Sequence, residues 1–73
     1  MAQEILEVPI TGKVISVEAK VGDEVQEGDV ICHIESMKME NPILAPVAGK
    51  ITELKVSVGE VVSTGNVIAI IEY

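Results

Sequence analysis

The chain has 73 residues, a mass of 7.8 kDa and a formal net charge of −7. A chain of this size is near the lower limit for an independent hydrophobic core, so one domain over residues 1–73 is expected, with no room for a separate catalytic domain. Five scattered lysines and no arginine argue against nucleic-acid binding, which needs clustered cations. No apolar run approaches the roughly 18 residues of a membrane span.

The cysteine content and the N-terminal residues indicate the cellular compartment of the protein. Cys32 is the only cysteine, so it cannot form an intramolecular disulfide. The sequence Met1-Ala2-Gln3-Glu4 lacks the basic start of a signal peptide. We therefore expect a cytoplasmic protein.

The apolar residues are mostly Val and Ile, which favour strands over helices. In chain order, short strands are predicted within 12–17 and 30–34, each bounded by Gly, Asp or Pro. Glycines interrupt the apolar runs at Gly22 and again at Gly28, and the pair Gly28-Asp29 is typical of a two-residue hairpin loop. The prolines are expected at strand starts, sheet edges or bends, because proline cannot donate to a sheet ladder.

The second half of the chain repeats the first. Residues 9–35 align with 46–72 at a constant shift of 37 positions without a gap. Identical pairs include Pro9/Pro46, Gly12/Gly49, Lys13/Lys50, Gly22/Gly59 and Gly28/Gly65. Solenoids need at least three units, and only two fit here. The prediction is an all-β fold, a flattened barrel or sandwich of two four-stranded antiparallel sheets, with the two halves facing each other about a quasi-twofold axis.

The segment between the halves is Met37-Lys38-Met39, flanked by Glu35 and Glu40 and followed by Asn41-Pro42. It is expected to form an exposed hairpin tip. Paired methionines are flexible and polarisable, which suits contact with several partner surfaces. The alternative is that both methionines fold back onto the end of the barrel and Lys38 is an ordinary surface charge.

Residues 35–42, followed by Ala45-Pro46-Val47-Ala48-Gly49-Lys50-Ile51, resemble the attachment region of the biotinyl/lipoyl carrier domain family, and most of all its biotin carboxyl carrier branch. The resemblance covers residues 5–73 and implies a barrel-like sandwich of two four-stranded sheets. Ser36 stands where biotin carriers most often have alanine. The chain also lacks the linker and the protruding loop of some of these carriers.

The resemblance implies that a biotin protein ligase acylates the Lys38 amine, with Met37, Met39, Glu35 and Glu40 as recognition residues. The chain would then be a carrier and not an enzyme, with biotin carboxylase and carboxyltransferase components as partners. The alternative is that lipoate is attached to the same lysine by a lipoate ligase, either in place of biotin or as well as biotin, although lipoyl domains typically carry Asp-Lys-Ala at this turn. The hypothesis from another class is an unmodified β-module that only binds a partner protein.

Cys32, His33 and a group of acidic residues are candidate functional groups, but a structural role explains each of them more simply. Cys32 and His33 are adjacent, so on a strand they point to opposite faces and cannot share a metal or form a nucleophile-base pair. Cys32 aligns with Ala69, which favours a small buried residue, and His33 is expected to be partly covered. The acids Asp23, Glu24, Glu27 and Asp29 are interpreted as a solvated loop face, with a weak cation site as the alternative.

Overall fold

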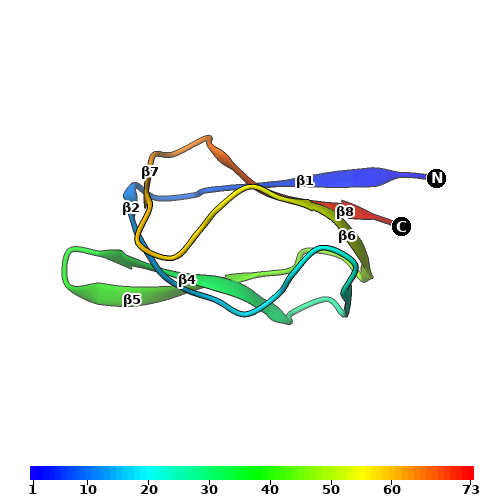
Figure 1. Cartoon of the computed structure of the whole chain (residues 1–73), viewed down its shortest axis with the longest axis horizontal. Coiled ribbons are helices and arrows are strands. Elements are labelled where there is room, and N and C mark those ends of the chain that lie inside the picture. The colour runs from blue at the N-terminus through cyan, green and yellow to red at the C-terminus, as the bar shows by residue number, and fades with distance from the viewer.

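The computed structural model describes residues 1–73 and contains eight strands and no helix (Figure 1). No helical segment is therefore available to cross a membrane. The strands are β1 (Gln3–Glu7), β2 (Gly12–Val17), β3 (Glu24–Val25), β4 (Val30–Ser36), β5 (Met39–Leu44), β6 (Gly49–Leu54), β7 (Val61–Val62) and β8 (Val67–Glu72).

These strands form two antiparallel sheets of four strands each. One has the order β1-β8-β6-β3 and the other the order β5-β4-β2-β7. The predicted all-β sandwich is thus confirmed. Pro42 lies in β5, at the edge of its sheet, where no ladder hydrogen bond is lost.

The repeat continues through the whole fold. Adding 37 to the bounds of β2 gives the bounds of β6, and the same shift relates β3 to β7. It also converts the strand order of one sheet into that of the other. The quasi-twofold axis is therefore a property of topology as well as of sequence.

The two halves do not form one sheet each. Each sheet takes two strands from each half, because β3 pairs with β6 and β7 pairs with β2. The physical reason is the length of β3 and β7, which have two residues each. A tight turn on each side of such a strand redirects the chain across the sandwich, so the halves interlace.

The glycine turns are not two-residue hairpin loops, contrary to expectation. Gly28 is the third residue of a four-residue turn that the Asp29 amide closes by donating to the Gln26 carbonyl at 3.0 Å. The φ of Gly28 is +93°, as a type II turn requires at this position. The Asp29 carboxylate also accepts the Gln26 amide at 2.8 Å, and the turns at Gly22, Gly59 and Gly65 repeat the arrangement.

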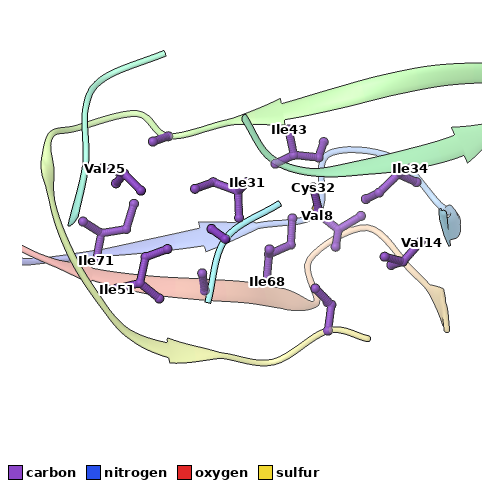
Figure 2. Close-up of a cluster of buried hydrophobic side chains, with 14 of the residues drawn as sticks. Val8, Val14, Val25, Ile31, Cys32, Ile34, Ile43, Ile51, Ile68 and Ile71 are labelled. Atoms are coloured by element: carbon purple, nitrogen blue, oxygen red, sulfur yellow. The ribbon is translucent and has the colours of Figure 1, made fainter. Parts of the chain in front are cut away.

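The core lies between the sheets and contains apolar side chains only (Figure 2). Side chains of β4 and β5 such as Ile31 and Ile43 face those of β6 and β8 such as Ile51 and Ile71. Burying one such side chain stabilises the fold by about 1.5–3 kcal/mol. This core supports the sandwich without disulfide or metal.

The two ends of the elongated molecule, whose extents are 37 × 18 × 16 Å, are structurally equivalent. The β4–β5 hairpin projects at one end and the two termini lie together at the other (Figure 1). There Ala2 and Tyr73 exchange two backbone hydrogen bonds of 2.8 and 2.9 Å. The shift of 37 maps this pair onto Met39 and Ser36, which pair directly below the Lys38 turn.

Candidate functional site

Met37 and Lys38 form the tip of the β4–β5 hairpin. Ser36 pairs with Met39, so only two residues connect the strands. Both have positive φ, 54° for Met37 and 65° for Lys38. Positive φ at both central residues is the requirement of a type I′ turn, whose twist matches that of the flanking strands. A residue with a Cβ atom loses about 1–2 kcal/mol in this conformation, so the turn is strained at two successive positions.

The side chains at this tip are exposed, as expected. Met37 is 92% exposed and Met39 67%, and Lys38 is also exposed. The alternative that the methionines fold back onto the barrel is therefore wrong. The tip therefore exposes two apolar side chains beside one lysine.

Lys38 takes part in none of the ion pairs of the structure. These pairs join His33 to Glu18, His33 to Glu40, and Lys55 to Glu53. The Lys38 amine is thus exposed to solvent on a two-residue turn and has no carboxylate partner. Such an amine is accessible to an incoming electrophile.

Glu35 and Glu40 lie directly opposite each other, two residues below the tip. Like charges in this position oppose pairing by a few tenths of a kcal/mol up to about 1 kcal/mol. On the other side of β4, Lys13 pairs with Glu35 in the register of β2 and β4. The equivalent positions at the termini hold Glu72 and Gln3, so the acid pair occurs only at the Lys38 end.

His33 has a polar environment that the sequence pattern does not reveal. Its Nδ1 lies 2.7 Å from Ser16 Oγ and 3.8 Å from Glu18 Oε2, and its Nε2 lies 3.6 Å from Glu40 Oε1. The expectation that His33 is partly covered is confirmed, since its side chain is 23% exposed. The ring links β2, β4 and β5 on the outer face of the sheet.

The Cys32 side chain points to the inner face of the sheet, opposite to His33, and is fully buried, as predicted. Burial raises the pKa of its thiol from 9.0 to about 11 through desolvation. Its repeat partner Ala69 is equally buried.

Two of the acidic residues considered for a cation site, Asp23 and Asp29, accept hydrogen bonds from backbone amides in turns. No group of acidic, histidine or cysteine side chains has the geometry of a metal site.

The Lys38 end has no concave pocket. A depression of the surface lies at the opposite end and is lined by residues that include Met1, Glu24, Lys50 and Glu72. A group bound to Lys38 would therefore project from the domain and would not be enclosed by it.

Asn41 was not among the site residues predicted from the sequence. Its amide Nδ2 donates to the Met39 carbonyl at 3.1 Å and to the Ile34 carbonyl at 3.3 Å. The available signal was the contrast with its repeat partner, since the shift of 37 aligns Asn41 with Glu4.

Comparison with known proteins agrees with this geometry. The biotin/lipoyl family model, described as biotin-requiring enzyme, matches residues 4–71. The propionyl-CoA carboxylase alpha chain of Ruegeria pomeroyi is 51% identical over 37 residues, which are 51% of this chain and 5% of that protein. A biotinylated protein of Mycobacterium bovis is 42% identical over 45 residues, which are 62% of each chain.

A solved structure extends the likeness to the whole fold. The urea carboxylase of Kluyveromyces lactis matches with a TM-score of 0.90 and 33% identity, over 99% of this chain and 6% of that one. This chain thus spans only a small part of the carboxylases that it resembles. With a family match over nearly its full length, the chain belongs to the biotin/lipoyl family of biotin-requiring enzymes.

Proposed function

We propose that this chain is a biotin carboxyl carrier, with biotin attached covalently to Nζ of Lys38. The observation that carries the proposal is the placement of Lys38 at a two-residue turn, exposed and outside every ion pair. Of the other four lysines, Lys13 and Lys50 lie within strands, and Lys55 is paired with Glu53 at 2.9 Å. Lys20 is exposed, but it is the first residue of the turn at Gly22 and does not lie at the tip of a hairpin. Only Lys38 combines exposure with a protruding, fixed backbone.

Attachment requires a biotin protein ligase that supplies biotinyl-adenylate. The neutral Lys38 amine attacks the acyl carbon, an amide C–N bond forms, the acyl–phosphate C–O bond breaks, and AMP leaves while the amine loses a proton. The chain contributes presentation of the amine, with Met37, Met39, Glu35 and Glu40 as the surface that the ligase contacts. The lysine charge disappears in this step.

Bound biotin would supply a ureido nitrogen that accepts and donates a carboxyl group, as group-carrying cofactors provide the chemistry themselves. The domain holds that group at the end of a rigid hairpin, so that it can enter the active sites of a biotin carboxylase and a carboxyltransferase. Several relatives of this chain are carboxylases, which supports the proposal. In this role the chain is a substrate and carrier, and we infer a cytoplasmic location.

The intact mass after incubation with biotin ligase, biotin and ATP tests the proposal. The acyl group of biotin adds about 226 Da, and peptide mapping should place it on Lys38. Lys38→Arg should remove the shift and leave the thermal transition unchanged, because the side chain buries little. Lys20→Arg, which changes a lysine next to the Gly22 turn, should be labelled like the parent.

The same measurement separates the alternatives. A shift of about 188 Da with a lipoate ligase and none with biotin ligase would show a lipoyl carrier. No shift with either ligase would contradict a carrier function and favour the unmodified binding module. Labelled carrier should then accept carboxyl groups from radioactive bicarbonate and ATP in the presence of biotin carboxylase.

A further inference from the structure

The turn that presents Lys38 needs a stabilising contact beyond the strand ladder. Met37 and Lys38 both adopt positive φ, although glycine, asparagine and aspartate are the residues that tolerate it. Neither side chain at the tip has a hydrogen-bond or ion-pair partner in the structure. A contact that stabilises the turn must therefore come from residues of the two strands that lead into it.

The Asn41 side chain lies in this position. It donates one bond along its own strand, to the Met39 carbonyl, and one across the hairpin, to the Ile34 carbonyl. Since both acceptors are carbonyl oxygens, only the NH2 group can face them, and the orientation of the amide is fixed by chemistry. Asn41 pairs with Ile34 in the strand register and is half-buried, so water competes only partly for these bonds.

The equivalent position in the other half provides a natural comparison. Glu4 occupies it on β1, opposite Ile71, and a carboxylate cannot donate to a carbonyl. At that end the strands are not joined by a turn, because Ala2 and Tyr73 are close to the chain ends. The donating amide thus occurs only in the copy that has a strained turn to hold.

We propose that Asn41 is a positioning residue that fastens the Met39 carbonyl to β4 and so keeps the Met37-Lys38 turn in the conformation that the ligase binds. This rests on the proposed function, since a positioning role needs a modified lysine. Without the amide, the turn would sample relaxed conformations with negative φ. The ligase would then have to order it on binding, which weakens binding of the carrier and leaves the chemical step unchanged.

Three variants test the role of Asn41. Asn41→Ala removes both donors, Asn41→Asp replaces the donor group with an acceptor of the same shape, and Glu4→Gln is the control at the equivalent site. We expect the KM of biotin ligase for the carrier to rise about tenfold in both Asn41 variants with kcat unchanged. Glu4→Gln should match the parent in both constants.

NMR provides a readout that needs no ligase. In Asn41→Ala, amide exchange at Ser36 and Met39, which pair directly below the turn, should accelerate about tenfold, and the couplings that report φ at Met37 and Lys38 should move toward averaged values. Amides of Ile51 and Ile71 in the other sheet should keep their protection. Adding Met37→Gly to Asn41→Ala should restore slow exchange at the tip, because glycine adopts positive φ without steric cost.

Three results would contradict the positioning role of Asn41, and a fourth would separate it from the carrier function. Unchanged couplings and exchange at the tip in Asn41→Ala would overturn the positioning role, and so would a loss of protection across both sheets that Met37→Gly does not restore. A fall in kcat with constant KM would also contradict it. If the parent is never labelled but Asn41→Ala loosens the tip, then the turn is held as described and it is the carrier function that fails.

Discussion

Burial couples the ionisation of Cys32 to folding. Its side chain is fully buried between the sheets, and desolvation raises the pKa of the thiol to about 11. Because the thiolate is the reactive form, burial makes the side chain inert toward alkylating reagents in the folded protein. Its repeat partner is alanine, so the core accepts a smaller side chain at the equivalent place.

This coupling predicts a loss of stability at alkaline pH. The unfolded thiol releases its proton near pH 9 and the folded thiol near pH 11, so between these values the unfolded state binds fewer protons. The free energy of unfolding therefore falls as pH rises through this window, by at most roughly 3 kcal/mol from this group, and the contribution is fully present below pH 9.

Urea unfolding at pH 8 to 11 of the parent and of Cys32→Ala measures the effect. Other groups that titrate in this range are common to both proteins, so the difference between the two curves isolates the thiol. We expect the parent to lose more stability than the variant as pH rises. Parallel curves would contradict the coupling.

At the scale of secondary structure, Gly12 and Gly49 set the distance between neighbouring strands. A Cβ atom on Gly12 would collide with the Glu35 backbone carbonyl and would lie 2.7 Å from Cγ2 of Ile34. Gly49 meets Glu72 and Ile71 in the same way. These glycines are needed for close approach, whereas Gly28 and Gly65 face open space and are needed for positive φ.

The two kinds of glycine should respond differently to alanine. Gly12→Ala and Gly49→Ala should each lower the free energy of unfolding by about 2–3 kcal/mol, because backbone atoms must move to admit the methyl group. Gly28→Ala and Gly65→Ala should each lose about 1–2 kcal/mol from conformational strain alone. Chemical denaturation of the four variants tests this, and unequal losses within either pair would count against the structural equivalence of the halves.

The positions of the strands were largely predictable from the sequence, but the way in which the chain crosses from one sheet to the other was not. Val and Ile runs and the shift of 37 indicated the strands within 12–17 and 30–34, and the structure confirms them as parts of β2 and β4. The two-residue strands carry too little periodicity to reveal a partner in the other half. The turn type at Gly28 was mistaken because Gly-Asp occurs both at the centre of hairpin loops and at the end of type II turns.

For the molecule as a whole, the quasi-twofold axis explains how so small a domain builds one core and projects a single hairpin from it. Interlaced halves share a single apolar core, with the hairpin at one end of the molecule and the termini at the other (Figure 1). A group on Lys38 therefore points away from the point where a longer chain would continue. The expected placement of Lys38 at an exposed tip was predictable from its position between the repeats. The Asn41 contacts were not, because they depend on the strand register.

The equivalence of the two ends predicts that the chain can be circularly permuted. The backbone pair between Ala2 and Tyr73 matches the Met39–Ser36 pair below the turn, so Asn-Gly between Tyr73 and Ala2 should close a type I′ turn. A permutant that starts at Lys38 and ends at Met37 should fold with a free energy of unfolding within about 1 kcal/mol of the parent, since its new ends lie at an exposed tip.

Under the proposed function, this permutant also tests whether biotin ligase would recognise the turn or the local sequence. Lys38, Met39 and Glu40 remain in order, but the turn at Met37 and Lys38 is open. We expect native circular dichroism and cooperative melting together with a large loss of labelling, because an amine on a free chain end is not held in the bound conformation. Labelling at the parental rate would show that the ligase reads the sequence and orders the turn at little cost, and a failure to fold would contradict the equivalence of the two ends.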